Sequence, residues 1–461
     1  MITILLTART IAARQSRRNR SRATSKEKVD HLTGISPGHF GPTLDLCRPH
    51  PEIFSPSRMI SRNITLNYEH RALFTRDVFD PANSTLRKLI EDALDERERS
   101  KVLIFVDDGV LQGAGKLLEQ ISAYFEANAD VLQLVAAPIS VPGGEASKNQ
   151  WDLVKKLWEA ISDTGICRHS YVIGIGGGAV LDLVGFAAST AHRGVRHVRM
   201  PTTTLSQGDG GVGVKNGVNF FGKKNWVGSF SVPFAIINDL DFLKTLPERG
   251  RRAGIIEAIK VALIRDGEFF EAIEAKADQL ANLEDDALEF VIRRSAELHM
   301  NHIALGGDPF ELGSSRPLDF GHWAAHKLEQ ISEFRVGHGE AVAIGMGIDL
   351  LYAARTRQLD PEDAQRILNL IERIGFKLWD PDLRKSDGEQ LLVLRGLEEF
   401  REHLGGELTV TLVTGIGHAV EVHEMDVAEI LPVFDDLEAR ARRTEKQPVT
   451  DAKPIPAGQP A

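Results

Sequence analysis

Apolar and polar positions in the first half of the chain alternate between short, strongly apolar runs and longer segments with helical spacing. The apolar runs have the length of buried strands. They lie at 101–110, 131–139, 170–175 and 196–201. The segments between them repeat apolar side chains every three or four positions, as amphipathic helices do. They include 85–98, 116–128 and 151–165. Strands and helices in turn predict a parallel sheet with crossover helices, a Rossmann-like α/β fold.

The pattern changes after about residue 247, where the remaining ordered segments all have helical spacing. They are 254–264, 269–282, 287–305, 321–331 and 340–355. The sequence therefore predicts a Rossmann-like α/β domain over 61–246, followed by an all-α domain over 247–440. Residues 1–60 lack sustained periodicity, and residues 441–461 are polar and proline-rich. We predict a disordered basic arm and a disordered tail at these two ends.

Charge and composition exclude several classes of protein. The chain has 461 residues, of which 42% are hydrophobic, which is enough for a buried core in two or more domains. Its formal net charge of -10 argues against a general nucleic-acid-binding role. The only cysteines, Cys47 and Cys167, cannot form a disulfide framework or a cysteine-based metal site. The scarcity of cysteines fits a reducing, cytoplasmic setting. No apolar run approaches the 18 residues of a membrane span, so we expect no membrane partner.

The basic start of the chain has two interpretations. Residues 1–34 carry eight basic and two acidic side chains, a net charge of +6, which leaves -16 for the rest. An arginine-rich, acid-poor start is typical of a targeting peptide. The alternative is a disordered extension without a targeting role.

A glycine turn, Gly174 to Ala179, lies between a predicted strand and a predicted helix. Glycines let the backbone approach a pyrophosphate, and the helix N-terminus favours its negative charge. The same turn could join strand and helix without a ligand, because the acidic residue that dinucleotide folds place about 20 positions onward is absent. The stretch after Pro201 combines threonines, Asp209, glycines and lysines, and it predicts an irregular region that binds a polyanion. A basic surface loop is the alternative.

A candidate metal site comes from the second half of the chain. Glu257 is acidic in an otherwise apolar helical segment, His322 and His326 share one helix face, and His338 stands at a predicted helix start. A carboxylate with imidazoles and no cysteine suits zinc or a similar divalent ion at an open site. Each histidine could instead be structural, as could His299 and His302, and spacing alone does not choose among them.

Seven motifs, in this order, resemble those of 3-dehydroquinate synthase and the related sugar phosphate cyclases. They are GGEASK, GIGGGAVLDLVGFAASTAHRG, PTTTLSQGDGGVGVKNGVN, GKKN, TLPERGRRAGIIEAIKVALI, DFGHWAAHK and GHGEAVAIG. The resemblance runs from about residue 100 to 420. It implies an N-terminal NAD domain and a C-terminal helical metal domain, with the active site between them, in a homodimer.

The resemblance also assigns roles to residues. Glu257, His322 and His338 match the metal ligands, for zinc or cobalt, and His326 matches a contact to the substrate phosphate. Further substrate-side matches are Lys215, Lys224, Asn225, Lys260 and Arg193, the last from the partner subunit of the dimer. Matches to NAD contacts are Asp107, Glu145, Lys148, Gly177, Gly178, Asp182, Thr202, Thr203, Leu205, Asp209, Thr245 and Leu246.

The resemblance implies a reaction on a phosphorylated keto-sugar. A ring hydroxyl is oxidised to a ketone with NAD, and the ketone acidifies the neighbouring C–H so that phosphate leaves. Hydride then returns, the ring opens, and an intramolecular aldol reaction closes a carbocycle. Metal, lysines and His326 would act through orientation and electrostatics.

Three positions differ from dehydroquinate synthases where those enzymes hold the substrate carboxylate. His299 replaces a family lysine, Ser315 (beside Arg316) an arginine, and Asp319 an asparagine. Because a negative charge at Asp319 would repel a carboxylate, we expect a substrate without one, such as the sedoheptulose 7-phosphate of 2-epi-5-epi-valiolone synthases. Those enzymes usually have GHTWSP where this chain has GHWAAHK, which most resembles the dehydroquinate-synthase-like cyclases of ebo gene clusters.

Two other functions remain open at this point. A metal-dependent dehydrogenase of the alcohol or glycerol type would share the fold, the glycine turn and a histidine-rich metal site. Lys215, Lys224 and Arg193 argue against it, because an alcohol without phosphate needs no such cations. A non-catalytic scaffold is the third hypothesis, and the retained Glu257, His322 and His338 argue against that one.

Overall fold

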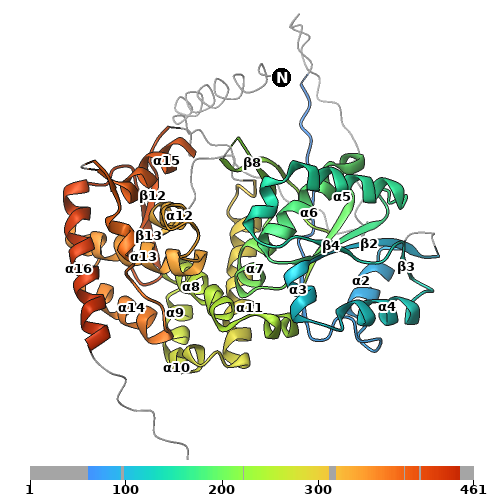
Figure 1. Ribbon diagram of the computed structural model, residues 1–461, viewed down its shortest axis with the longest axis horizontal. Helices are drawn as coiled ribbons and strands as arrows, with labels where there is room; N and C mark the ends of the chain where they lie inside the picture. The colour runs from blue at the N-terminus through green and yellow to red at the C-terminus, as the bar shows by residue number, and fades with distance from the viewer. Residues whose placement is uncertain are drawn as a thin grey trace, which may run out of the picture. The chain divides into compact units, whose positions relative to one another are not determined.

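The structure is a computed structural model that describes residues 61–94, 98–221, 223–310, 318–388, 390–403 and 406–446 (Figure 1). The predicted arm, 1–60, lies outside these residues, and so does most of the predicted tail. The chain divides into two units at Leu66. Residues 61–66 of the first unit are exposed and have no helix or strand. Everything below concerns the second unit.

A parallel sheet forms the core of the first half, as predicted. Its strands follow the order β1-β9-β6-β5-β2-β3, and β4 also pairs with β2. Their bounds are β1 Ala72–Thr75, β2 Ser100–Asp107, β3 Leu132–Leu134, β4 Ile139–Val141, β5 Tyr171–Gly176, β6 Arg196–Pro201 and β9 Ala235–Asp239. The single strand predicted at 131–139 is two strands, because Pro138 has no N–H for a sheet hydrogen bond.

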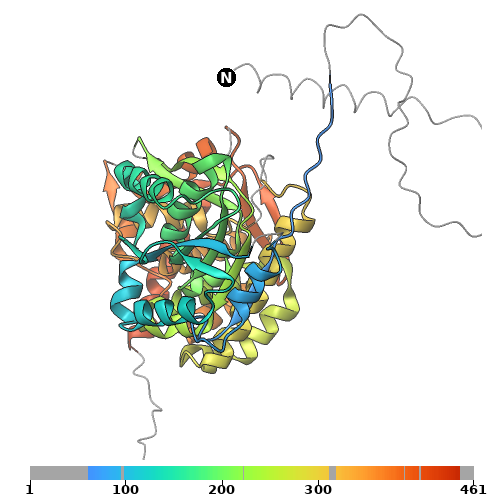
Figure 2. The ribbon, with the colours of Figure 1, turned by 90° about the vertical axis from the view of Figure 1, so that its right-hand side faces the viewer.

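Helices cover both faces of this sheet (Figures 1 and 2). Alternate residues of β2 and β5 face opposite sides: Ile104 packs in one apolar cluster and Leu103 in another. The first cluster holds α2 (Thr85–Glu91) and α4 (Leu117–Ala127), and the second holds α5 (Trp151–Asp163) and α6 (Gly178–Thr190). Shorter helical segments lie at α3 Asp108–Gly113, η1 Glu145–Asn149, η2 Ala191–Arg193, α7 Thr204–Gly208, η3 Gly210–Val212 and η4 Leu240–Thr245.

The region predicted to be an irregular polyanion loop is mostly regular, which corrects that expectation. Strands β7 (Lys215–Phe220) and β8 (Lys223–Phe230) form an antiparallel hairpin. Its glycines allow close pairing: a Cβ at Gly228 would press into the Asn216 backbone. Gly217 and Gly228 therefore serve backbone contact between the strands, whereas Gly208, Gly210, Gly211 and Gly213 lie in the helical turns just before β7.

The second half is built mainly of helices, as predicted. They are α8 Glu248–Arg265, α9 Gly267–Ala275, α10 Ala277–Ala281, α11 Asp285–Leu305, α12 His322–Ile331, α13 His338–Arg355, α14 Pro361–Ile374, α15 Arg395–His403 and α16 Val427–Lys446, with η5 Pro381–Arg384 and η6 Leu392–Leu394. Two short hairpins also occur there, which helical spacing did not predict. They are β10 Ser386–Asp387 with β11 Gln390–Leu391, and β12 Val410–Gly415 with β13 His418–Val422.

Two further features concern the predicted limits. Helix α16 continues to Lys446, so the ordered chain extends past the predicted limit at 440. None of the helices described here is both long and apolar enough to cross a membrane.

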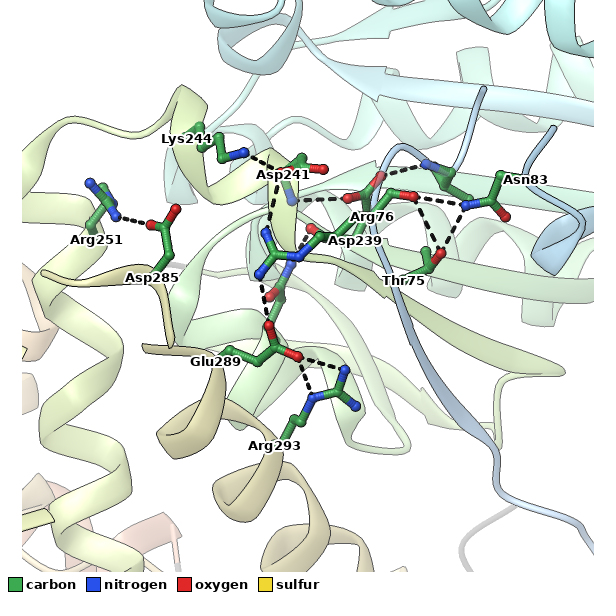
Figure 3. Close-up of polar contacts among 12 residues, drawn as sticks. Thr75, Arg76, Asn83, Asp239, Asp241, Lys244, Arg251, Asp285, Glu289 and Arg293 are labelled. Atoms are coloured by element: carbon green, nitrogen blue, oxygen red, sulfur yellow. Dashed lines mark hydrogen bonds and ion pairs between the residues drawn. The ribbon is translucent and has the colours of Figure 1, made fainter. Parts of the chain in front are cut away.

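A polar network joins the sheet to the helical half (Figure 3). Arg76, just after β1, contacts Asp241 after β9 at 3.4 Å and Glu289 on α11 at 2.7 Å. Beneath this surface pair, the buried carboxylate of Asp239 accepts the backbone N–H of Val78 at 2.7 Å and that of Asp241 at 2.9 Å. The buried carboxylate of Asp239 thus holds the two segments after β1 and β9 that carry the ion-paired residues Arg76 and Asp241.

The buried hydrogen bonds of Asp239 should contribute more to the free energy of unfolding than the ion pairs of Arg76. We expect Asp239→Ala to lower the free energy of unfolding by about 2–4 kcal/mol, because two backbone donors lose their acceptor. Arg76→Ala should lower it by no more than about 1 kcal/mol, because partly exposed ion pairs contribute little. Urea denaturation of both variants checks this, and a larger loss for Arg76→Ala would contradict it.

Candidate active site

Three helices of the second half bring Glu257, His322 and His338 together. Glu257 lies in the buried middle of α8, and the two histidines are the first residues of α12 and α13. Glu257 Oε1 is 3.8 Å from His322 Nε2 and 3.4 Å from His338 Nε2. One ligand atom from each of the three residues fits within 4.8 Å of the others. The residues predicted as metal ligands are therefore adjacent in space.

The other ring nitrogen of each histidine is held by an acceptor. His322 Nδ1 lies 3.0 Å from the carbonyl oxygen of Phe320, and His338 Nδ1 lies 3.1 Å from Glu329 Oε2. Each acceptor can take a proton from Nδ1, and the Nε2 atom of each ring lies toward Glu257. One carboxylate and two imidazole nitrogens, each backed by a hydrogen-bond acceptor, fit a divalent cation such as zinc.

The electrostatics of this group favour a cation. Burial alone would raise the pKa of Glu257, but Lys260 and the two histidines hold that pKa well below its usual range. For His338, burial would lower the pKa, yet hydrogen bonds to Glu257 and Glu329 raise it to about 10. Burial lowers the pKa of His322, which favours the neutral imidazole that binds metals.

Lys260 connects the metal group to the α/β half. Its Nζ lies 2.6 Å from Glu257 Oε2 and 3.3 Å from Asp209 Oδ2, and Asp209 Oδ1 lies 3.1 Å from His299 Nδ1. Burial opposes the charge of Lys260, but the carboxylates of Glu257, Asp209 and Asp319 raise its pKa. His299, for which a purely structural role was open, therefore lies beside the candidate site.

The predicted nucleotide contacts gather around the carboxyl ends of the strands, where parallel α/β sheets bind ligands. Asp107 ends β2, Gly177 caps α6 after β5, and Thr202 and Thr203 follow β6. The others flank this edge: Gly178 and Asp182 on α6, Glu145 and Lys148 on η1, Leu205 and Asp209 at α7, and Thr245 and Leu246 at the end of η4. A Cβ at Gly113 on α3 would lie 3.0 Å from Thr245 Cβ, so η4 also reaches the β2 end.

Some predicted ligand groups already contact one another. Lys148 Nζ binds Asp182 at 2.8 Å and also Asn225 Oδ1. Lys148 is a match for an NAD contact and Asn225 for a substrate contact, so the two sets meet here. Thr203 accepts the N–H of Ser206 and caps α7, which gives this residue a structural role of its own.

The substrate-side residues come from the hairpin and from α12. Lys215 begins β7, while Lys224 and Asn225 lie on β8. The His326 ring stacks on His338 with 6.0 Å between centroids. Arg193 lies on η2, before the amino end of β6, whereas Thr202 and Thr203 follow the carboxyl end of the same strand. Its backbone has a left-handed φ of 63°.

Three buried charged residues near the site were not singled out from the sequence. Glu329 lies seven residues after His322 on the same helix, a spacing that could have signalled it. Asp349 accepts the N–H of Gly321 at 2.9 Å and Trp323 Nε1 at 2.8 Å, so it fixes the start of α12, and burial raises its pKa to about 7. The third is Arg199 on β6. Of the substrate-side departures, Asp319 accepts the N–H of His322 through its carbonyl, and Ser315 lies outside the described residues.

Comparison with known proteins gives consistent matches. Residues 138–253 match the family model for the 3-dehydroquinate synthase N-terminal domain, and 254–393 match the C-terminal one. A 2-epi-5-epi-valiolone synthase of Streptomyces glaucescens is 33% identical over 82% of this chain and 93% of its own. A 3-dehydroquinate synthase of Nitrosospira multiformis is 35% identical over 69% of this chain and 85% of its own.

Solved structures agree with these matches. The 2-epi-5-epi-valiolone synthase of Streptomyces hygroscopicus, solved with NAD+ and Zn2+ bound, has a TM-score of 0.71 and 29% identity over 83% of this chain and 99% of its own. A glycerol dehydrogenase from Schizosaccharomyces pombe reaches a TM-score of 0.53 at 15% identity, over 84% of this chain and 93% of its own. That second likeness concerns the fold alone.

The ligand group can be tested with two substitutions of the same type. Glu257→Gln removes the carboxylate charge from the group itself, so we expect metal content and activity to fall together. Glu329→Gln keeps an acceptor for His338 Nδ1 but removes its charge, and we expect zinc affinity to weaken about 10–100-fold while binding persists. Chelator competition and elemental analysis measure both. Normal metal content in Glu257→Gln would refute the ligand assignment.

Proposed function

Because this chain belongs to the 3-dehydroquinate synthase family, we propose that it is a sugar phosphate cyclase that uses NAD and a divalent metal ion. The substrate would be a phosphorylated keto-sugar, from which phosphate is eliminated before the carbocycle closes. The observation that carries the proposal is the buried Glu257, His322 and His338 group, joined through Lys260 and Asp209 to the edge of the sheet. A metal site and a nucleotide edge linked in this way suit a reaction that needs both.

The residues fit the two cofactors. Glu257, His322 and His338 would hold the metal ion, and the glycine turn with the strand ends around Asp107 and Thr202 would hold NAD. When bound, NAD supplies a reversible oxidation of a substrate hydroxyl, and the metal supplies polarisation of the substrate oxygens.

The side chains around the metal group would orient the substrate and neutralise its charge. Lys224, Lys215 and His326 are candidates for the phosphate, because two ammonium groups and an imidazole can donate to its oxygens. Lys260 is buried beside the carboxylates of Glu257 and Asp209, so it would offer a positive charge and a hydrogen-bond donor to the substrate. Asn225 would position the substrate beside Lys224.

A homodimer would account for Arg193. Within one chain, this arginine lies before the amino end of β6, away from the carboxyl ends of the strands. A partner subunit could present its own Arg193 to the substrate phosphate, as the family resemblance implies. We also propose that the enzyme acts in the cytoplasm.

The substrate would lack the carboxylate of the dehydroquinate precursor. Asp319 precedes α12, and its negative charge is among those that raise the pKa of Lys260, so it acts at the metal group. His299 is engaged with Asp209 at 3.1 Å rather than offering a free lysine-like charge. Both features favour a heptulose phosphate without a carboxylate, such as sedoheptulose 7-phosphate.

The cyclase can be separated from its alternatives in one assay. Purified enzyme with zinc and NAD is mixed with sedoheptulose 7-phosphate, and phosphate release and NADH absorbance are followed together. We expect phosphate release without accumulation of NADH, because the hydride returns in each turnover. Stoichiometric NADH would identify a dehydrogenase instead, and protein without metal or NAD affinity would favour a scaffold.

The substrate preference has a matched test at Asp319. We expect the carboxylate-bearing precursor of dehydroquinate to be turned over with a kcat/KM about 10–100-fold below that of sedoheptulose 7-phosphate. Asp319→Asn should raise kcat/KM for the carboxylate substrate and leave kcat/KM for sedoheptulose 7-phosphate nearly unchanged. Efficient conversion of the precursor by the wild-type enzyme would overturn this substrate argument.

A further inference from the structure

Arg199 is a fully buried arginine whose hydrogen-bond partners are uncharged. It lies in the middle of β6, between β5 and β9, on the sheet face covered by α6. Its Nη1 donates to the carbonyl oxygens of Gly213 at 3.0 Å and Gly211 at 3.2 Å, with Gly210 at 3.4 Å. Its Nη2 donates to the carbonyl of Lys215 and to Asn216 Oδ1, both at 2.7 Å. One guanidinium thus binds most of the segment 210–216.

This segment connects two groups of the candidate site. It begins directly after Asp209, which contacts Lys260 and His299, and it ends at Lys215, the first residue of the hairpin. Besides Arg199, the segment is held by the turn hydrogen bond from Val212 N–H to Asp209 O at 3.0 Å and by the N–H of Ser231, which the carbonyl of Val214 accepts at 2.9 Å. His70 Nε2 also lies 2.7 Å from the carbonyl oxygen of Val212. Each of those contacts reaches a single residue of the segment, whereas Arg199 is the common donor to the carbonyl groups on both sides of the turn between Asp209 and Lys215.

The neighbouring helix has a glycine that makes room for this arrangement. A Cβ at Gly185 on α6 would lie 2.8 Å from Asn216 Cγ and 3.0 Å from His197 Cε1. Without a side chain at this position, Asn216 can turn its amide oxygen toward Arg199. Glycine on α6, arginine on β6 and asparagine on β7 thus form one contact set from three separate elements.

The charge of Arg199 has little direct compensation. Burial lowers its pKa, and Asp182, which is itself paired with Lys148, provides the opposing electrostatic effect. A guanidinium is a costly choice for this position unless its donors are used, because a buried cation without a carboxylate loses its hydration. Nη1 and Nη2 are both engaged, while Nε is buried without a hydrogen-bond partner among the described residues. The carbonyl groups of the segment need those donors equally, because an unpaired buried carbonyl is also unfavourable.

We propose that Arg199 is a positioning residue: it fixes the segment 210–216 and so sets Asp209 and Lys215 in place for the sugar phosphate. The catalytic part of this proposal rests on the proposed cyclase function. The structural part does not, and each part has its own measurement.

Hydrogen exchange of the zinc-loaded protein tests the structural part. In Arg199→Gln we expect amide exchange at residues 210–216 to rise at least about 10-fold, because the carbonyl groups lose their common donor. Arg196→Gln is the matched control. This arginine also lies on β6, but it binds Tyr171 Oη at 2.8 Å, away from the segment, so exchange at 210–216 should stay at the wild-type rate. Wild-type exchange in a folded Arg199→Gln protein would overturn the proposal.

A conservative variant keeps the test decisive if Arg199→Gln does not fold. Arg199→Lys keeps the positive charge, but one ammonium group cannot reach all five acceptors. Faster exchange confined to 210–216 is the expected result, and an unchanged rate would again overturn the proposal.

Kinetics and metal content test the catalytic part. We expect Arg199→Lys to raise KM for sedoheptulose 7-phosphate and to lower kcat/KM about 10–100-fold, because small displacements of substrate-orienting groups are costly. Zinc content should stay at the wild-type level, since the candidate ligands lie on α8, α12 and α13. Arg196→Gln should stay within about 2-fold of the wild type. Unchanged kinetics beside altered exchange would refute the catalytic part, whereas an inactive wild-type enzyme would refute the proposed function and leave the exchange result intact.

Discussion

The close approach of α7 and α8 at Gly254 is the contact on which the rest of the site depends. Thr204 on α7 accepts the N–H of Gly254 and donates to the carbonyl of Gly250, each at 2.9 Å. A Cβ at Gly254 would lie 2.6 Å from Thr204 Cβ, so only glycine permits this distance. Glu257 follows one turn later on α8. Helix α7 begins just after the end of β6. The contact between Thr204 and Gly254 therefore places Glu257, the first candidate metal ligand, relative to the end of β6.

The second constraint is the burial of charge at this junction. Glu257, Lys260, Asp209 and His299 form a chain of alternating acidic and basic groups that crosses from α8 to the α/β half. Glu257 and Lys260 are buried and are acceptable there only because their neighbours carry the opposite charge, while Asp209 and His299 are partly exposed. The same carboxylates that raise the pKa of His338 favour a divalent cation. The network that joins the two halves is thus also the network that prepares the metal site.

Much of this arrangement could be predicted from the sequence, and particular residues show where prediction ends. Helical spacing predicted α8, α12 and α13, and apolar runs predicted β2, β5 and β6. Spacing could not choose between His322 and His326, because both lie on one face of α12. In three dimensions His322 Nε2 lies 3.8 Å from Glu257 Oε1, but His326, Glu329 and His338 also form a group that could hold a metal ion, so the choice of His322 stays a prediction. The choice in advance came from family resemblance, as did the set of nucleotide contacts.

Arg199 illustrates the kind of residue that a linear pattern does not reveal. In the sequence, Arg199 is one polar position in a strand. His197 lies two residues earlier, on the same face of the strand, and is also buried, so the alternation of polar and apolar positions does not distinguish them. Its partners lie 11 to 17 residues onward and are mostly carbonyl groups, which every residue type possesses. Backbone acceptors leave no signature in side-chain chemistry, so only the folded path of 210–216 identifies them. Groups that position a site through backbone atoms are therefore the ones for which a structure adds most to a sequence.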